Sequence, residues 1–271
     1  QFDYFKENDY EVIPLSKLVD ALREKTPISD KWVVLTIDDN FKSFYENGLE
    51  VFKEYNYPFT LFVYVKAAEK KYGDYSGWDD LRQIAKYGEV DFHSYAHPHM
   101  TKLSKEDLQK DFEVGLKLFE KELGFKPRYF TYPYGEYDES VKNIAKSYGF
   151  EGIVNQNMGA VSSQSDHYNL DRSALGENSN LAQLLRYKHL NVEWISPKRY
   201  PKNSILDLLH VKTKSTSKKA GLYITGIGWQ ELDMKNGEVN QIINKSLINE
   251  RTRLILSIGN NISTQILIKD K

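Results

Sequence analysis

The sequence contains no cysteine, which excludes disulfide bonds and thiolate metal sites from this chain. Long hydrophobic runs are also missing: the longest stretches, such as residues 59–65, extend over about seven residues, whereas a membrane-spanning helix needs roughly 20. Neither sign of charge is in excess, because 37 basic residues face 38 acidic ones and the net charge is −1. The composition therefore predicts no transmembrane segment in this chain and no electrostatic footprint for nucleic acid.

A start methionine and a signal peptide are likewise absent, since the chain opens on Gln1, and we expect a mature form or a fragment. The chain does have 271 residues, 40% of them hydrophobic, which fits one large domain or a large domain plus a small one. Its 19 tyrosines, together with its tryptophans, can form stacking surfaces for sugars. We expect most of these aromatic residues to fill core and surface positions instead.

Up to about residue 190, short apolar strands alternate with amphipathic helices. Strands are predicted over residues 32–37, 59–65, 90–92, 129–131 and 152–154, and helices over residues 41–55, 76–88, 104–124 and 139–148. Alternation of this kind predicts an α/β fold with a mainly parallel sheet or an α/β barrel.

After residue 189 the pattern changes to strands alone. They are predicted over residues 192–195, 205–211, 220–227, 253–258 and 262–268, with turn signals at 235–237 and 259–261. No convincing helix lies among them. We therefore expect two domains, an α/β domain over residues 1–189 and a small all-β, sandwich-like domain over residues 190–271.

The predicted strand over residues 32–37 runs directly into two adjacent carboxylates, Asp38 and Asp39. Neighbouring carboxylates repel each other, so a partly buried pair needs a cation, a shared proton or open water. A second motif follows the strand over 90–92, where His93 and His97 lie four residues apart. Neutral imidazole is the commonest metal ligand, but this spacing alone also fits surface or hydrogen-bonded histidines.

Both motifs follow predicted strands, which favours a shared site. The carboxyl ends of parallel strands gather at one face, and active sites form there. Two histidines and one carboxylate make a three-ligand metal site with open positions, which is typical of catalytic sites. One aspartate would bind the metal, and the other would act as general base on the water that the metal activates. The sequence thus predicts metal-assisted attack of water on a polarised carbonyl.

A third motif, residues 130–135, places Pro133 and Gly135 directly after a predicted strand. Proline fixes φ and glycine permits a tight bend, so a rigid turn there can aim a backbone N–H at a developing oxyanion. An ordinary strand-to-helix turn has the same signature.

Together, the three motifs resemble those of the polysaccharide deacetylases (carbohydrate esterase family 4, the NodB homology domain). The family's Thr-Phe-Asp-Asp-Gly is matched by residues 36–40, its His-Ser/Thr-x-x-His-Pro by residues 93–98, and its Arg-x-Pro-Tyr-Gly in part by residues 131–135. The resemblance implies a distorted, incomplete (β/α) barrel and removal of acetyl groups from N-acetylated sugars. The residues of the third motif are similar to those found at this motif in the branch that includes the poly-N-acetylglucosamine deacetylases.

The family's roles carry over onto the matching positions. Asp38 would be the general base, while Asp39, His93 and His97 would hold a metal, usually Zn²⁺, with other divalent ions such as Co²⁺ as alternatives. The backbone N–H of Tyr134 would help to stabilise the oxyanion.

Two positions depart from the family pattern. Asn40 replaces glycine, but asparagine tolerates a left-handed backbone better than most residues, so the turn can survive. Thr131 stands where many members carry an arginine that contacts the base. We expect Arg172 to take over the orientation of Asp38.

The general acid is the hardest role to place. Many members supply a histidine from a late Leu-x-His motif, which residues 208–210 imitate, but these residues fall in the predicted β domain. His167, in a loop of the α/β domain, is the preferred candidate, and a structural or exposed histidine is the alternative for both. Ser94 would brace the metal loop.

The resemblance implies a polysaccharide substrate and a periplasmic, surface or secreted location. It also implies that the N-terminal strand of the domain is missing from this chain. A catalytically weak glycan-binding protein that retains the metal site is the alternative function, and a metallohydrolase acting on a different amide or ester is a third. The sequence does not identify the polymer, the oligomeric state or the role of the β domain.

Overall fold

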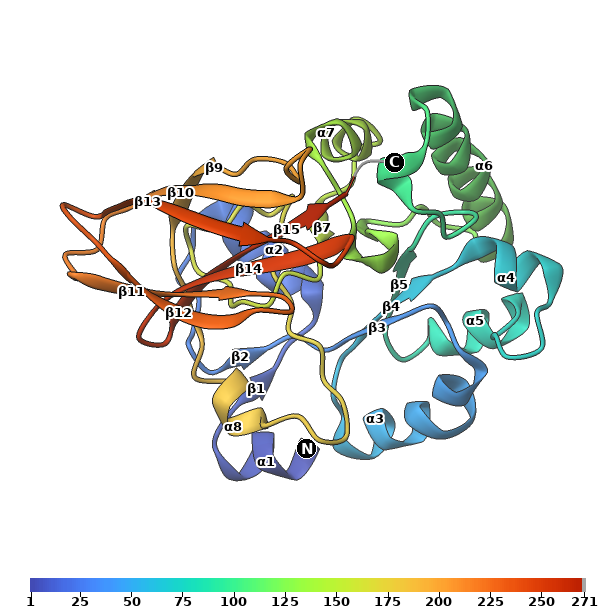
Figure 1. Cartoon of the computed structure of the whole chain (residues 1–271). Helices are drawn as coiled ribbons and strands as arrows, with labels where there is room; N and C mark the ends of the chain where they lie inside the picture. Colours follow the sequence, from blue (N-terminus) through green and yellow to red (C-terminus); the bar gives the residue numbers. More distant parts are fainter. Residues whose placement is uncertain (270–271) are drawn as a thin grey trace. The chain divides into compact units, whose positions relative to one another are not determined.

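The computed structural model describes residues 1–269, which form two compact units (Figure 1). Unit 1 comprises residues 1–155 and 166–170, and unit 2 comprises residues 156–165 together with those from 171 onward. The predicted domains, a catalytic one up to residue 189 and an accessory one from residue 190, also assign a function to each part. Contacts alone do not test those functions, so this division stays a proposal.

A five-stranded parallel sheet forms the centre of unit 1. Its strands, in spatial order, are β3 (Thr36–Asp38), β4 (Thr60–Val63), β5 (Glu89–Phe92), β6 (Tyr129–Thr131) and β7 (Gly152–Val154). Spatial order equals chain order and every neighbouring pair is parallel, so each connection crosses over in the same direction. This is the predicted α/β architecture, a curled, incomplete (β/α) barrel with helices along its outer side (Figure 1).

Helices connect the strands of unit 1. They are α1 (Phe2–Glu7), α2 (Leu15–Glu24), α3 (Leu49–Tyr55), α4 (Val65–Lys70), α5 (Trp78–Ile84), α6 (Lys105–Leu123) and α7 (Glu139–Ser147). The longest, α6, has the predicted caps: the Ser104 hydroxyl accepts a hydrogen bond from the Asp107 N–H, and the helix ends at Gly124 with a left-handed φ of 82°.

The core of unit 1 is rich in aromatic rings and lies directly beneath the predicted site. All four residues of β4 are buried. Phe92, Phe112, Phe130 and Phe150 lie with ring centroids between 5.0 and 6.2 Å apart. Each such side chain contributes about 1.5–3 kcal/mol by burial, so β5 and β6 form a firm support for the residues that follow them.

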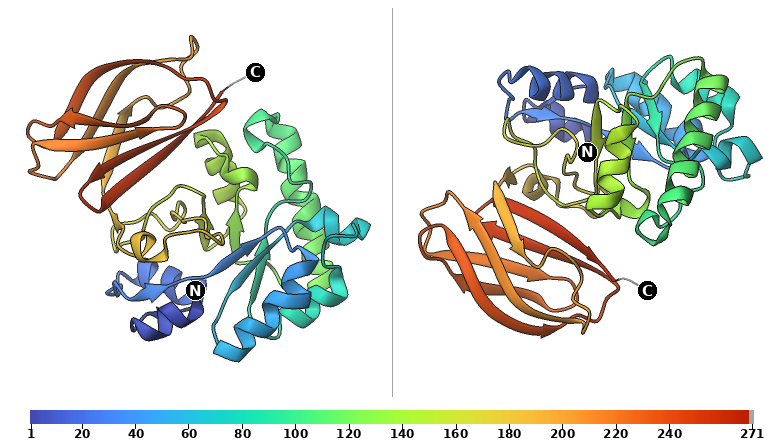
Figure 2. Two further views of the ribbon diagram at one scale, coloured as in Figure 1. Left: turned by 60° about the horizontal axis from the view of Figure 1, so that its bottom comes forward. Right: turned by 90° about the horizontal axis from the view of Figure 1, so that it is seen from above.

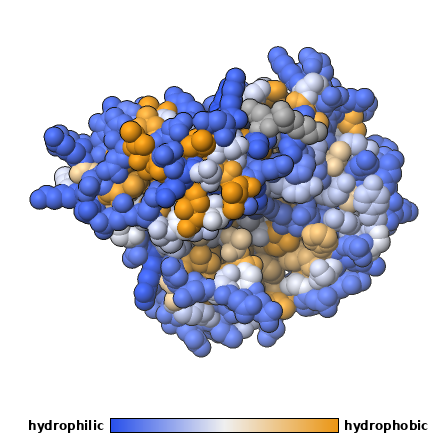
Figure 3. All heavy atoms as spheres, viewed as in Figure 1, coloured by the Kyte–Doolittle hydropathy of each residue, from blue (hydrophilic) through white to orange (hydrophobic). Residues whose placement is uncertain are grey.

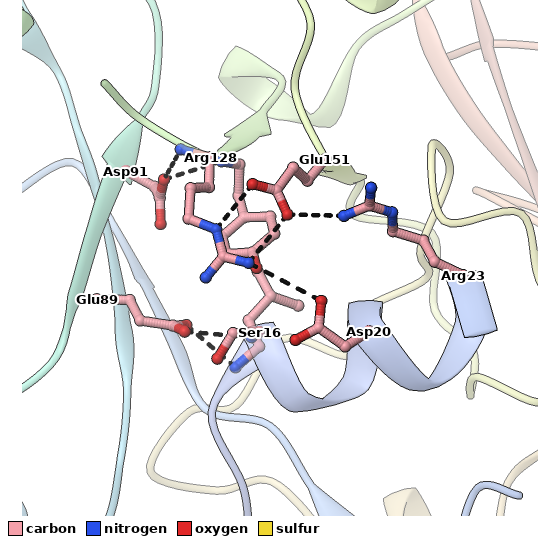
Figure 4. A network of polar contacts seen from close by, with 9 residues as sticks. Ser16, Asp20, Arg23, Glu89, Asp91, Arg128 and Glu151 are labelled. Carbon is pink, nitrogen blue, oxygen red and sulfur yellow. Dashed lines mark hydrogen bonds and ion pairs between the residues drawn. The ribbon is translucent and has the colours of Figure 1, made fainter. Parts of the chain in front are cut away.

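A polar network at the beginning of β5 connects α2 to the sheet (Figure 4). The Glu89 carboxylate accepts hydrogen bonds from the first two N–H groups of α2, at 3.1 and 3.2 Å. Arg128 donates two hydrogen bonds of 2.9 Å to Glu151, which also accepts one from Arg23 on α2. The N-terminus of α2 is therefore capped by a carboxylate distant in sequence.

The predicted strand over residues 32–37 is wrong as a single element. β2 (Trp32–Val33) pairs with β1 (Glu11–Val12), whereas β3 pairs with β4, so the chain passes from one sheet to another within this run. The predicted helix over residues 41–55 begins with a π-helical segment, Phe44–Gly48, before α3. The apolar run continued without a break, so hydrophobicity could not reveal where the pairing partner changes.

The strands of unit 2 form a β-sandwich with two stacked sheets (Figure 2). One sheet has the order β13 (Glu238–Ser246), β10 (Ile205–Thr213) and β9 (Val192–Ser196). The other has the order β12 (Gly228–Asp233), β11 (Lys219–Ile224), β14 (Arg251–Ile258), β15 (Asn261–Ile268) and β8 (Lys188–His189). Buried side chains from both sheets, among them Leu209, Val239, Leu222 and Leu256, form one core, which confirms the predicted class.

Three strands of this unit, β8, β12 and β13, and the short helix α8 (Leu181–Leu184) were not predicted. The outward-facing positions of β12 are exposed and include Glu231 and Asp233, so its sequence has few apolar residues. Figure 3 shows apolar and polar residues interspersed over the visible strands. Alternation with polar residues on one face is typical of an antiparallel sheet with a solvated side.

Within residues 1–269, none of the helices combines the length and the apolar character required to cross a bilayer.

Candidate metal and active site

The Asp38–Asp39 pair lies at the carboxyl end of β3, and His93 directly follows β5. Asp39 has a left-handed φ of 73°, as have Ser94 (69°) and His97 (51°). Such conformations are uncommon for residues other than glycine and concentrate at functional sites. The two motifs, more than 50 residues apart in sequence, meet at one edge of the sheet.

Asp39, His93 and His97 form a cluster in which one ligand atom from each lies within 4.8 Å of the others. Asp39 Oδ1 is 3.1 Å from His97 Nε2 and 3.5 Å from His93 Nε2. Two imidazole nitrogens and one carboxylate oxygen match the donor set of a three-ligand zinc site with open positions. The residues predicted to hold a metal are thus brought together with suitable donors.

A hydrogen bond at Nδ1 of His93 leaves its other ring nitrogen, Nε2, available to bind a metal. Its Nδ1 lies 2.8 Å from the backbone oxygen of Thr131, so Nδ1 carries the proton and Nε2 presents its lone pair to the cluster. The side chain is buried, and burial lowers the pKa of His93 below its usual value, while the charges of Asp38 and Asp39 oppose this only in part. A neutral imidazole is the form that binds metal.

The loop between the two histidines is held by hydrogen bonds to its backbone. Ser94 Oγ accepts one from the His97 N–H at 2.9 Å, in agreement with its predicted bracing role. The two carboxylate oxygens of Asp111, on α6, accept from the N–H groups of Tyr95 (2.9 Å) and Ala96 (2.8 Å). Burial raises the pKa of Asp111, and the two N–H donors act in the opposite direction.

Sequence reasoning missed Asp111, although a signal existed. On α6 it lies on the buried face, between Leu108 and Phe112, where an apolar residue is expected. A carboxylate in the apolar stripe of a helix indicates a buried partner, because an unpaired buried charge is costly.

The structure explains why asparagine is suitable at position 40. Asn40 has a left-handed φ of 43° and is completely buried. Its side-chain oxygen accepts from the Tyr64 N–H at 2.8 Å, and its amide nitrogen donates to the Ser76 carbonyl at 3.0 Å. A glycine would supply the backbone conformation but neither hydrogen bond.

Tyr134 lies next to the cluster, with a φ of 58° between Pro133 and Gly135. Its ring centroid is 4.5 Å from that of His97 and 4.2 Å from that of His99, which it stacks on. His99 Nδ1 in turn lies 2.8 Å from a carboxylate oxygen of Glu136. The second and third motifs are therefore in contact through these side chains.

His167, one of the two remaining predicted site residues, is not part of this cluster. His167 lies on a segment parallel to β7, and its backbone oxygen accepts from the Ile153 N–H. Since Leu170 pairs with Val154, His167 is at the amino-terminal half of β7, whereas the cluster is at the carboxyl ends of the strands. A catalytic role for His167 therefore has no geometric support here.

Arg172 belongs to unit 2, where its backbone N–H donates to the Asn157 oxygen at 3.0 Å. Its predicted action on Asp38 stays a prediction. His210, the histidine of the late Leu-x-His imitation, is on β10 of unit 2, where Nε2 is paired with Glu238.

A histidine, histidine and aspartate cluster at the carboxyl edge of a parallel, incomplete barrel defines a candidate metal centre. The sequence profile described as "Polysaccharide deacetylase" matches residues 25–153, the segment that carries all three motifs. This segment is therefore a domain of the polysaccharide deacetylase family, as the motifs predicted.

Relatives with this domain include YxkH of Bacillus subtilis, whose name assigns it to the same family. It is 25% identical over 171 residues, covering 62% of this chain and 60% of the relative. The poly-β-1,6-N-acetyl-D-glucosamine N-deacetylase of Escherichia coli is 27% identical over 108 residues, covering 35% of this chain and 16% of the relative. The chain thus spans less than two thirds of either curated relative.

Among solved structures, the Streptococcus pyogenes deacetylase PplD, determined in complex with acetate, aligns with a TM-score of 0.64 at 21% identity. The alignment covers 68% of this chain and 83% of that structure. At this identity the similarity establishes the fold, an incomplete (β/α) barrel.

Proposed function

We propose that this protein is a metal-dependent hydrolase that removes N-acetyl groups from a polysaccharide containing N-acetylglucosamine, outside the cytoplasm. The observation that carries the proposal is the cluster of Asp39, His93 and His97 with a second carboxylate, Asp38, directly beside it. The names of the curated relatives, which include a poly-N-acetylglucosamine N-deacetylase and a chitin deacetylase, support this substrate class.

In this proposal Asp39, His93 and His97 hold a divalent metal, with Zn²⁺ favoured by the donor set and Co²⁺ as an alternative. The metal supplies Lewis acidity, which polarises the acetamide carbonyl and lowers the pKa of water. Asp38 accepts the proton of the attacking water as general base. The carbon–nitrogen bond then breaks, the proton taken up by Asp38 is returned to the sugar amine, and acetate leaves.

The surrounding residues position this machinery. The backbone N–H of Tyr134 is the proposed donor to the developing oxyanion; the left-handed turn there and the contact of its ring with His97 support this role. Asp111 and Ser94 fix the loop that carries both histidines. For Arg172 we keep the role of orienting Asp38, which predicts that Arg172→Ala lowers kcat without changing metal affinity. A wild-type kcat in that variant would remove Arg172 from the mechanism.

The test is acetate release from β-1,4- and β-1,6-linked N-acetylglucosamine oligomers with added Zn²⁺ or Co²⁺. We expect Asp38→Asn to bind metal like the parent but to lose about 10²–10⁴-fold in rate, the range of general-base catalysis. Asp207→Asn, which neutralises an exposed carboxylate on β10, is the matched control and should keep full activity.

Three outcomes would contradict the proposal. Bound metal without acetate release from any acetylated glycan would favour the catalytically weak glycan-binding protein. Activity on acetyl esters or cyclic amides alone would indicate a hydrolase with a different substrate. Equal rates for the parent and Asp38→Asn would exclude Asp38 as the base.

A further inference from the structure

The outer face of β11 and β12 in unit 2 combines an exposed indole with three charged groups. Strand alternation and cross-strand pairing bring Tyr223 opposite Trp229, Gly221 opposite Glu231, and Lys219 opposite Asp233. Residues on the other face of the same strands, such as Leu222 and Leu232, belong to the core. The outer face therefore has a stable backbone beneath it that does not depend on these side chains.

A hollow of about 510 Å³ lies on this face. The side chains that contribute to its lining come from three strands, β11, β12 and β14, and from the segment just before β11. They include Ser217, Lys219, Trp229, Glu231, Ser257 and Ile258.

Gly221 lines this hollow, and neighbouring side chains come close to its backbone. A Cβ built on Gly221 would lie 2.5 Å from Ser257 Oγ and 3.3 Å from the Trp229 ring. The backbone of Gly221 is not left-handed, so the strand geometry does not itself require glycine. In the middle of a strand, glycine is unfavourable and often marks a place where a ligand approaches closely.

Trp229 forms one wall of this hollow and is 57% exposed. Its ring is held at 5.5 Å from Tyr223. Its indole presents both an apolar face and a polar N–H. A pyranose ring has the matching chemistry, with an apolar C–H face that can stack on the indole and hydroxyl groups that can reach the polar rim.

The charges on the rim favour a cationic sugar. The Lys219 ammonium lies 2.8 Å from a Glu231 oxygen and 2.9 Å from an Asp233 oxygen, so two carboxylates share one cation and the group has a net charge of −1. The pKa of the Lys219 amine is raised mainly by its hydrogen bond to Glu231. An incoming ammonium would therefore meet an excess of negative charge.

We propose that this hollow binds a glucosamine unit of the polysaccharide, stacked on Trp229 with its free amine directed to Glu231 and Asp233. The inference rests on the proposed function, since it assigns to unit 2 the de-N-acetylated form of the same polymer. Its occupant is a glycan with free amino groups, and the fully acetylated chain is the weaker ligand.

The test measures binding rather than turnover. Full-length Asp38→Asn protein without added metal is titrated calorimetrically with a β-1,4-linked glucosamine hexamer and with its N-acetylated counterpart. This background separates the two proposals, because binding at unit 2 requires neither metal nor the base. We expect Trp229→Ala to weaken binding of the glucosamine hexamer by tenfold or more, in line with the cost of losing a stacked aromatic partner.

Two further variants keep the test independent of folding defects. Gly221→Ala adds a methyl group that forces Ser257 Oγ, and with it the lining of the hollow, to shift, and Glu231→Gln removes one negative charge without changing shape. Both should weaken binding, whereas Ile242→Ala, at an exposed position on the other sheet, should not.

Wild-type affinity in both Trp229→Ala and Gly221→Ala would overturn the site. Equal affinity for the free-amine and acetylated hexamers would overturn the assignment to a cationic sugar.

Discussion

At the scale of single residues, Asn40 does more than tolerate a left-handed turn. Its side chain connects the loop after β3 to the N–H of Tyr64 and to the carbonyl of Ser76, all in a buried setting. The family motif has glycine here, so consensus alone would suggest that Asn40→Gly is neutral or stabilising. The buried hydrogen bonds predict the opposite.

We expect Asn40→Gly to lower the free energy of unfolding by about 1–3 kcal/mol, because two buried backbone groups lose their partners. Chemical denaturation of the two proteins measures this difference. Asn56→Gly is the matched control, since Asn56 has a similar φ of 52° but is exposed at the end of α3. If both variants lost the same stability, the hydrogen bonds of Asn40 would not be the cause.

The residue types of the cluster were predictable because metal chemistry restricts them. Asp39, His93 and His97 follow predicted strands, and parallel strands end at one edge, so adjacency in space followed from the fold class. The partners of Asn40 and Asp111 were not predictable in the same way. Their acceptors and donors are backbone groups, which leave no pattern of side chains in the sequence.

At the scale of elements, the junction between β5 and β6 contains a buried carboxyl. Asp91 Oδ1 accepts from the N–H groups of Arg128 (2.7 Å) and Tyr129 (2.8 Å). Burial raises the pKa of Asp91 from 3.8 to about 7, against the effect of these two donors. The folded protein therefore holds a proton that the unfolded chain has released between these two pH values.

This predicts that part of the stability decreases as the pH rises. The contribution is complete below about pH 4 and declines by up to about 1.4 kcal/mol per pH unit until the pH passes about 7. Asp91→Asn keeps an oxygen for both N–H groups and removes the charge, so its melting temperature should depend less on pH and should equal or exceed that of the parent at pH 8. Parallel pH profiles for both proteins would rule out this origin.

The elements that could be predicted were those whose apolar residues recur with a regular spacing along the chain. Helix α6 has an apolar stripe, a serine cap and a terminal glycine, and all of these agree on its limits. The divided run at β2 and β3 and the polar strand β12 were missed, because their limits depend on which strand pairs with which. Pairing is a tertiary property that local propensity does not determine.

At the scale of the whole molecule, each of the two units has its own hydrophobic core. The candidate metal ligands belong to unit 1 alone. A ligand that binds only the folded form stabilises what it binds, by about 2.7 kcal/mol at a concentration of 100 times Kd.

We therefore expect calorimetry to show that Zn²⁺ raises the unfolding temperature of unit 1 and leaves the transition of unit 2 in place. A chelator should reverse the shift. Asp39→Asn should abolish it, while Asp207→Asn, in unit 2, should retain it. An equal shift of both transitions, or none, would contradict a metal site confined to unit 1.

The cap that Glu89 provides for α2 also has a consequence for the order in which the chain folds. Glu89 lies 74 residues after Leu15, whose N–H donates a hydrogen bond to its carboxylate. On a growing chain, α2 is synthesised well before the acceptor that completes its first turn, so it gains full stability only after β5 has joined the sheet. Long-range closure of this kind slows folding, and it makes the amino-terminal helix a late element although it is synthesised early.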